Sequence, residues 1–181
     1  MTRNVFATVL LVAVAGIMTA CATAPNSPAE REELADRAVQ TKEAFLANDP
    51  SLQELFDDAH AYAIFPSIGR GGAGVGGAYG RGVVYEGGEL IGYCDVSQGT
   101  IGLQLGGQSF RQLVFFRNAE ALDRFKYGDL ELSAQATAVA ATTGASTDVD
   151  YDHGVMIFTM TGGGLMYEAS VGGQRFTYQA K

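Results

Sequence analysis

The residue types most often used in catalysis are few in this sequence. It contains two histidines, His60 and His153, and no serine lies in a Gly-x-Ser-x-Gly nucleophile elbow. Neither histidine has a sequence neighbour that marks it as a general base or a metal ligand. A histidine paired with Cys94, as in an unrecognised hydrolase, is an alternative that the sequence leaves open. The pattern predicts a protein that is not an enzyme and has no cofactor or metal.

The densest chemical feature is the run of residues 69–82, in which arginines accompany many glycines. Gly72, Gly74 and Gly77 fit the spacing of the dinucleotide-binding fingerprint, which requires a helix directly after the glycines. The residues that follow, 83–85, are Val-Val-Tyr and predict a strand instead. The sequence therefore argues against nucleotide binding.

Glycines at nearly alternate positions leave one face of a strand without side chains, so another backbone or a flat apolar ligand can approach it closely. Two guanidinium groups beside exposed N–H groups of glycine turns make a candidate phosphate site. The alternative is tight packing in a strongly curved sheet, with the arginines solvated. The candidate ligand-binding residues are Arg70, Gly71, Gly72, Gly74, Gly76, Gly77 and Arg81.

Cys21 carries a second chemical signature at the end of an N-terminal export signal. Arg3 supplies a positive start, and residues 5–17 form an apolar stretch that is too short to span a bilayer comfortably. The ending Met18-Thr19-Ala20-Cys21 resembles the lipobox, at which bacteria attach a diacylglyceryl group to the thiol and then cleave. Because Ala22 follows instead of aspartate, the resemblance implies a lipoprotein held by acyl chains such as palmitate in the outer membrane, facing the periplasm.

These features predict a signal peptide over residues 1–20, a flexible tether over 21–29 and a single domain over 30–181. An ordinary signal peptide with a chance cysteine is the alternative, and it would be cut in nearly the same place. Cys94 is the only other cysteine, so no internal disulfide is expected. Its apolar surroundings predict a buried strand residue.

The charge of the chain narrows the range of partners. The formal net charge is −8 at pH 7, which argues against nucleic acid, and an anionic ligand needs a local basic site. Asp148, Asp150 and Asp152 suggest calcium by their spacing, but His153 and Thr159 replace the glycine and glutamate of a calcium loop. We favour an acidic surface loop without a bound cation.

Three helices are predicted. The first covers residues 30–46, where larger apolar residues recur at three- and four-residue steps. Its predicted buried face consists of Leu34, Ala38, Val39, Phe45 and Leu46. A second helix should begin after Asp49 with a Ser51–Glu54 capping box and run to about residue 58, and a third should cover residues 118–126 with Asn118 as its cap.

The chain from His60 onward is predicted to be mostly β. A first strand should end at Pro66, because proline donates no hydrogen bond to a ladder. Glycine pairs, Asp and Asn separate the later candidates, which cover residues 74–79, 82–85, 89–96, 100–105, 112–116, 130–138, 155–161, 165–171 and 175–179. The expected fold is α+β, with N-terminal helices, a mostly antiparallel, curved, glycine-rich sheet and one short inserted helix.

Several blocks occur in a fixed order along the sequence. They are Ala61-Tyr62-Ala63-Ile64-Phe65-Pro66-Ser67-Ile68-Gly69-Arg70-Gly71-Gly72, residues 76–77 and 80–84, the Gly/Gln-rich segment 97–108, the strand 113–116, the helix 122–125 and the alanine-rich stretch 136–141. Together they resemble the SYLF domain, a lipid-binding family of bacteria and eukaryotes. The resemblance covers about residues 30–179 and implies non-catalytic phospholipid binding, with Arg70 as a headgroup contact. The alternative function is a structural lipoprotein that holds an envelope protein partner and binds no free lipid.

Overall fold

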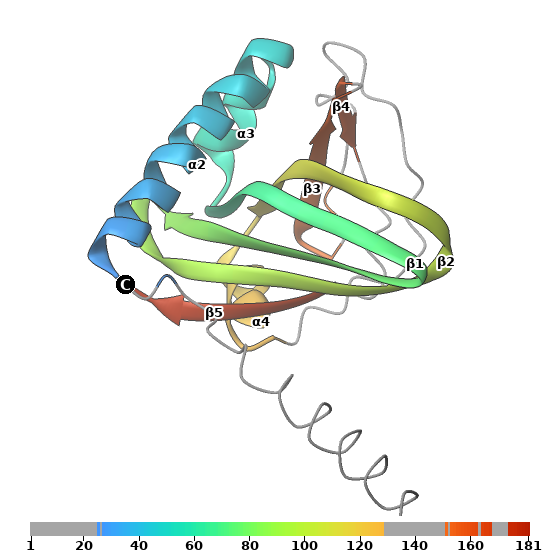
Figure 1. The fold of residues 1–181 in the computed structure, drawn as a ribbon. Helices are drawn as coiled ribbons and strands as arrows, with labels where there is room; N and C mark the ends of the chain where they lie inside the picture. The colour runs from blue at the N-terminus through green and yellow to red at the C-terminus, as the bar shows by residue number, and fades with distance from the viewer. Residues whose placement is uncertain (1–24, 26, 129–150, 152, 163, 168–173) are drawn as a thin grey trace, which may run out of the picture.

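The computed structural model describes residues 25, 27–128, 151, 153–162, 164–167 and 174–181. The elements in chain order are α2 (Pro28–Asn48), α3 (Leu52–Asp58), β1 (Ala61–Glu86), β2 (Glu89–Phe116), α4 (Ala119–Lys126), β3 (Val155–Thr161), β4 (Gly164–Tyr167) and β5 (Gln174–Ala180). Within these residues the strands form a five-stranded antiparallel sheet in the order β1-β2-β3-β4, and β5 also pairs with β2. The predicted α+β class, with its inserted helix α4, is confirmed (Figure 1).

β1 and β2 form one long hairpin that folds back on itself. Their register runs from Ala61 opposite Phe116 to Glu86 opposite Glu89, and it shifts at residues 72–74, where Figure 1 shows the two strands bending together. The tip of the hairpin returns to its base, because the Gly87 amide donates to the carbonyl that precedes β1 at 3.3 Å. We call residues 61–71 with 107–116 the inner half and residues 76–98 the outer half.

The long hairpin corrects the predicted strand boundaries. The expected strands 74–79 and 82–85 are parts of β1, and the expected strands 89–96, 100–105 and 112–116 are parts of β2. Within this hairpin most glycine pairs lie in continuous strands, because the partner strand keeps pairing with them through register shifts. The prediction that the first strand ends at Pro66 is also wrong, since the register skips Pro66 and Ser67 as a bulge and then resumes.

The last strands agree better with the sequence. The predicted strand 155–161 is β3, and the predicted strand 175–179 lies within β5. β4 covers the start of the predicted strand 165–171, whose later residues lie outside the described ones, as does the predicted strand 130–138.

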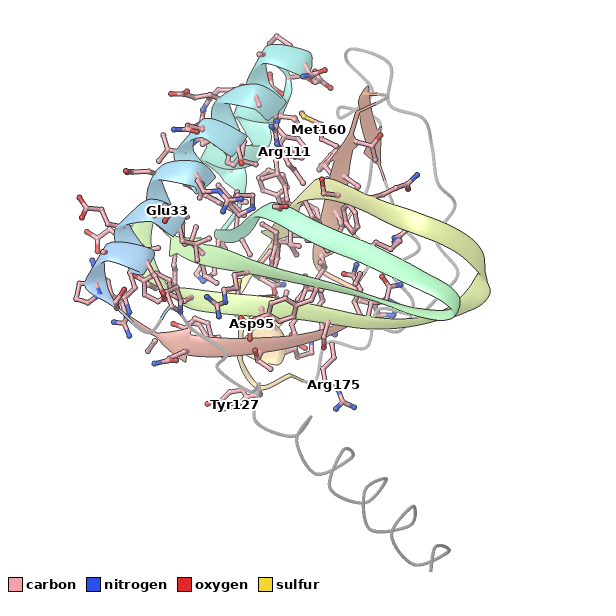
Figure 2. All side chains as sticks on the ribbon, in the orientation of Figure 1. Glu33, Asp95, Arg111, Tyr127, Met160 and Arg175 are labelled. Atoms are coloured by element: carbon pink, nitrogen blue, oxygen red, sulfur yellow. The ribbon has the colours of Figure 1, made fainter. Side chains whose placement is uncertain are left out.

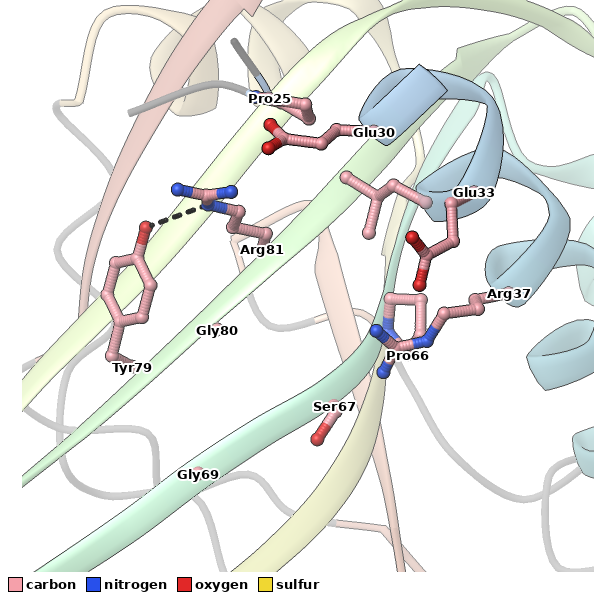
Figure 3. Close-up of a pocket in the computed structure, with 11 residues that line it drawn as sticks. Pro25, Glu30, Glu33, Arg37, Pro66, Ser67, Gly69, Tyr79, Gly80 and Arg81 are labelled. Atoms are coloured by element: carbon pink, nitrogen blue, oxygen red, sulfur yellow. Dashed lines mark hydrogen bonds between the residues drawn. The ribbon is translucent and has the colours of Figure 1, made fainter. Parts of the chain in front are cut away.

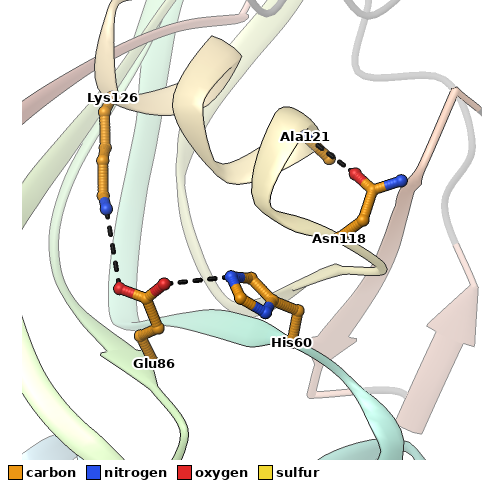
Figure 4. A network of polar contacts seen from close by, with 5 residues as sticks. All are labelled: His60, Glu86, Asn118, Ala121 and Lys126. Carbon is orange, nitrogen blue, oxygen red and sulfur yellow. Dashed lines mark hydrogen bonds and ion pairs between the residues drawn. The ribbon is translucent and has the colours of Figure 1, made fainter.

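The helices confirm most of their predicted ends and faces. α2 buries Leu34, Ala38, Thr41 and Phe45, whereas Val39 is 50% exposed, because it lies about 100° around the helix from Ala38. Asn118 caps α4 as predicted, with its Oδ1 accepting from the Ala121 amide at 3.0 Å (Figure 4). No helix among the described residues combines the length and apolarity needed to cross a membrane.

The predicted capping box before α3 does not form. Ser51 instead donates from its amide and its hydroxyl to Oδ1 of the buried Asp49, at 3.0 and 2.5 Å. An aspartate that accepts from the residue two positions later forms a turn of its own, which here connects α2 to α3.

Apolar layers cover both faces of the sheet, which explains why its strands contain continuous apolar runs such as residues 61–65 and 113–116. The layer under α2 and α3 consists of Leu34, Ala38, Phe45, Leu52, Phe56, Tyr62, Ile64, Val83, Tyr93, Leu113, Phe115, Met156, Phe158 and Met160. The opposite layer includes Phe65, Ile68, Cys94, Val96, Val114, Phe116 and Phe176 with Ala121, Leu122 and Phe125 of α4. Because α2 packs on residues of both halves of the hairpin, it lies across their junction.

Gly80 and Gly82 let the outer half cross the inner half at backbone distance. A Cβ at Gly80 would lie 2.8 Å from the Ser67 carbonyl oxygen, and one at Gly82 would lie 2.6 Å from the Ile64 carbonyl oxygen. Such contacts are shorter than real Cβ atoms make, so these positions require glycine. The close approach predicted from the glycine pattern is therefore made here by the chain's own backbone.

Candidate binding groove along helix α2

Two adjoining pockets lie between α2 and the folded hairpin. The first has a volume of about 430 Å³ and is lined by Pro25, Glu30, Glu33, Leu34, Arg37, Pro66, Ser67, Gly69, Tyr79, Gly80 and Arg81. The second has a volume of about 500 Å³ and is lined by Arg37, Pro66, Ser67, Ser109, Phe110, Arg111, Met160, Thr161 and Gly162. We call the first the mixed-charge pocket, the second the arginine pocket, and the two together the α2 groove. They share Arg37, Pro66 and Ser67, so they are neighbouring compartments of one groove.

The local fold explains why these residues meet. Leu34 and Ala38 anchor α2 on the sheet, and Arg37, between them on the helix, lies at the edge of this buried face. The bulge at Pro66 and Ser67 interrupts β1 directly opposite the helix. The crossing at Gly80 then brings Tyr79 and Arg81 to the same pocket. The groove is thus a product of the hairpin fold and of the helix position.

Arg81 interacts with several polar and charged residues in and beside the mixed-charge pocket. Its Nε donates to the Tyr79 hydroxyl at 3.3 Å, and this bond, with the nearby charges of Asp95 and Glu30, raises the pKa of Arg81 (Figure 3). Figure 3 shows Glu30 and Glu33 projecting from α2 on the side that faces the pocket. The pocket therefore presents both signs of charge.

Asp95 lies opposite Arg81 in the β1–β2 register and is only 4% exposed. Its Oδ2 accepts from the Thr177 hydroxyl at 3.0 Å. Burial raises the pKa of Asp95, and the Thr177 bond and the Arg81 charge oppose that rise. The negative charge of Asp95 therefore attracts Arg81 from the neighbouring strand, but burial disfavours the ionised carboxylate.

The arginine pocket combines positive charge, hydroxyl groups and apolar surface. Arg37 comes from α2 and Arg111 from β2, and Figure 2 places Arg111 and Met160 beside that helix. The Arg111 Nη1 lies 3.8 Å from the Met160 sulfur, a weak acceptor. Its walls therefore suit a ligand with an anionic group joined to an apolar one.

Comparison with known proteins finds a family match for the C-terminal part of the chain. Residues 97–181 match the Ysc84 family, described as "Las17-binding protein actin regulator". These residues are therefore similar to the Ysc84 (SYLF) domain family. The resemblance predicted from the sequence is thereby confirmed, and SYLF domains form a lipid-binding and interaction family, not a known enzyme family.

One relative of this chain is Beta cell expansion factor A of Aeromonas veronii. It is 25% identical to this chain over 132 residues, which cover 70% of this chain and 49% of the relative. The chain thus spans about half the length of the curated relative it matches. The segment matched to the Ysc84 family contributes six residues to the groove, whereas α2 and β1 precede it. These six are Ser109, Phe110, Arg111, Met160, Thr161 and Gly162.

The structure separates the candidate ligand-binding residues. Arg81 lines the mixed-charge pocket, and Arg70 lies with its guanidinium carbon 5.1 Å from the ring centroid of Phe110, which lines the arginine pocket. Gly71, Gly76 and Gly77 lie beside the bend of the hairpin and do not line either pocket. Gly72 and Gly74 lie at the bend, where they pair with Gly106 and Gly102 of β2. Cys21, Asp148, Asp150 and Asp152 lie outside the described residues. The two arginines thus approach one groove at different pockets.

Of the residues weighed for catalysis, His60 and Cys94 contribute to the fold through their side chains and His153 through its backbone. His60 Nε2 lies 2.9 Å from Glu86 Oε1, and the Lys126 Nζ lies 3.7 Å from the other oxygen of Glu86, so this network ties the hairpin tip to its base and to α4 (Figure 4). The His153 carbonyl accepts from Arg124. Cys94 is buried in β2 as predicted, and burial raises the pKa of its thiol well above the ordinary value, which argues against a nucleophile. The part of the chain that the structure describes holds no cluster of three potential metal ligands.

Sequence reasoning missed Arg37 and Arg111. The helical pattern carried a signal for Arg37, which follows Leu34 by three positions and directly precedes Ala38, so it had to lie at the margin of the buried face. Arg111 alternates with the buried Phe110 and Gln112 in β2, which predicts an exposed side chain and nothing more. Only the position of α2 over the sheet makes these two arginines neighbours of one pocket.

Proposed function

We propose that this protein is a lipoprotein of the outer membrane, facing the periplasm, that binds membrane phospholipid without catalysis and does so through the α2 groove. The Ysc84-family (SYLF) segment supports lipid binding as the general activity. The groove supplies the site, and acylated Cys21 supplies the attachment to the membrane.

The observation that carries the proposal is the composition of the groove. Arg37, Arg81 and Arg111 line it, and Leu34, Phe110 and Met160 add apolar surface. A phospholipid requires both kinds of contact, because its phosphate is anionic and its glycerol and acyl parts are apolar. Arg37 and Arg111, in the arginine pocket, form a local basic site in a protein whose net charge is −8.

The position of the groove along the chain agrees with a membrane anchor at Cys21. Pro25 lines the mixed-charge pocket, and four residues of extended chain reach at most about 14 Å. An acylated Cys21 would therefore hold the opening of this pocket near lipid headgroups. Acyl chains supply the attraction to the bilayer that a negatively charged surface lacks.

The test uses Cys21→Ser protein, so that the covalent anchor does not contribute to binding. Arg70→Glu combined with Arg81→Glu should abolish co-sedimentation with vesicles of phosphatidylglycerol and phosphatidylethanolamine, because both arginines approach the groove. Arg117→Glu combined with Arg175→Glu, at exposed positions outside both pockets, makes the same charge change and should bind normally. Equal binding by the two double variants would refute the site.

A second candidate function follows from the description of the family, which names binding to a protein. In that case the groove would hold an envelope protein partner, and no free lipid would bind. Lipid extraction and native mass spectrometry of the Cys21→Ser protein discriminate the two. Phospholipid at a defined stoichiometry supports the first function, whereas a lipid-free protein that retains a stoichiometric envelope partner supports the second.

A further inference from the structure

The arginine pocket has an unbalanced positive charge that the mixed-charge pocket lacks. Glu30 and Glu33 line the mixed-charge pocket, whereas the described lining of the arginine pocket contains two arginines and no acidic residue. Among the described residues, neither Arg37 nor Arg111 forms an ion pair. Two guanidinium groups that share a pocket without a carboxylate favour an anion between them.

The other lining groups match a phosphate more closely than a simple carboxylate. Ser67 and Ser109 bring hydroxyl groups, each of which can donate to a phosphate oxygen. Arginine binds phosphate oxygens through two parallel N–H bonds, so two arginines and two hydroxyls provide more donors than a carboxylate accepts.

A third arginine approaches the pocket behind Phe110. The guanidinium of Arg70 lies over the Phe110 ring at 5.1 Å, and its Nε is buried without a hydrogen-bond partner in the described part of the chain. Cation–π packing fixes this charge one ring away from the pocket. It adds to the positive potential without blocking the space between Arg37 and Arg111.

We infer that the arginine pocket is a phosphate-binding subsite, in which Arg37 and Arg111 hold the phosphate group and Ser67 and Ser109 donate to it. Pro66, Phe110 and Met160 form an apolar wall beside the phosphate, where the carbon part of a phosphate ester packs. The phosphate belongs to a phospholipid headgroup or to a soluble phosphate ester. The first source rests on the function proposed above.

The test compares two double variants of the full chain carrying Cys21→Ser. Arg37→Gln with Arg111→Gln removes both pocket charges, and both side chains are exposed, so folding should be unaffected. Arg117→Gln with Arg175→Gln is the matched control, because both arginines are exposed and lie outside both pockets. Circular dichroism and thermal unfolding should show the same fold in all three proteins.

Binding is measured in two arms, with inorganic phosphate by ³¹P NMR titration and with phosphatidylglycerol–phosphatidylcholine vesicles by co-sedimentation. Loss of two charge-assisted contacts should weaken phosphate binding by about tenfold or more in the pocket variant, and the control should match the parent protein. A parallel loss of vesicle binding identifies the lipid headgroup as the source. If the pocket variant loses phosphate binding and the parent protein does not bind vesicles, the phosphate belongs to a soluble ester. That result supports the subsite and refutes the proposed lipid function.

Two outcomes overturn the inference. If the pocket variant and its control bind vesicles and phosphate equally well, the arginine pocket is not the phosphate site, although lipid binding itself stands. If the parent protein binds neither inorganic phosphate nor vesicles, the subsite and the proposed function both fail.

Discussion

Gly80 and Gly82 lie where the outer half of the hairpin crosses the inner half, whereas Gly99 and Gly162 lie in open surroundings. A Cβ at either crossing position would lie within 3.0 Å of backbone or side-chain atoms, and a Cβ at either open position would meet nothing within 4 Å. The crossing glycines therefore hold the two halves together at backbone distance, and the open ones are free to carry side chains.

The two faces of the outer half also differ in whether they carry side chains. Gly80 and Gly82 face the layer that contains Phe65 and Ile68, while Arg81 between them faces α2 and the groove. The absence of side chains on one face thus places a charged side chain on the other. A change at the crossing should disturb the fold first and the groove as a consequence.

The largest effect is expected from Gly82→Val. Its Cβ would lie 2.6 Å from the Ile64 carbonyl oxygen and 2.8 Å from the Phe65 ring, so the two halves must separate. Overpacking against backbone should lower the free energy of unfolding by about 3 kcal/mol or more. Urea denaturation measures the change.

Gly99→Val is the matched control for Gly82→Val. It lies in open surroundings, where a β-branched residue suits a strand, so stability should change by less than about 0.5 kcal/mol. Similar losses in both variants would show that the crossing does not distinguish these glycines.

This contrast also marks how far the sequence could predict the fold. Local signals located α4 and β3, because the Asn118 cap and the apolar run 155–161 depend on neighbouring residues only. The glycine pattern predicted a close approach of backbone but not its partner. That partner, Ser67 and Ile64, comes from another part of the same strand, and nothing local specifies where a hairpin folds over.

The candidate site shows the same limit. Arg81 was predicted from its place among glycines, and it does line a pocket. Arg37 and Arg111 lie 74 positions apart and meet only because α2 packs across the hairpin. A sequence pattern can place each side chain on an exposed face, whereas the pocket depends on tertiary packing.

A smaller effect is expected at Gly92, where β5 covers the outer half. A Cβ there would lie 2.5 Å from both the Gln179 carbonyl oxygen and the Tyr178 ring. Gly92→Ala should therefore loosen β5, including the bond from the Tyr178 hydroxyl to the Ile91 carbonyl, and cost about 1–3 kcal/mol.

Hydrogen exchange resolves where Gly92→Ala acts. Amides of β5 should exchange faster while those of β3 stay protected, since β3 pairs with a different part of β2. Gly162→Ala, with nothing within 4 Å, should leave both strands unchanged. Faster exchange in β3 as well would mean that Gly92 controls the whole sheet instead of one contact.

The smallest effect is expected on the polar face of the outer half, from Asp95→Asn. Burial raises the pKa of Asp95 in the folded protein above its unfolded value, so the folded state binds more protons between those two values. The contribution of Asp95 to stability therefore falls as pH rises through that window, and the ionised carboxylate is a cost at neutral pH. Asparagine cannot ionise and still accepts from the Thr177 hydroxyl, so this variant should gain stability relative to the parent as pH rises from 3 to 7.

Thr177→Val sharpens the Asp95 prediction, because it keeps the carboxyl group and removes the donor that stabilises its charged form. The pKa of Asp95 should then rise further, and the loss of stability should extend to higher pH. Thermal unfolding at several pH values compares the three proteins. Parallel curves for the parent and Asp95→Asn would show that Arg81 and Thr177 fully offset the burial of this carboxylate, and the polar face would then support the groove without an electrostatic cost.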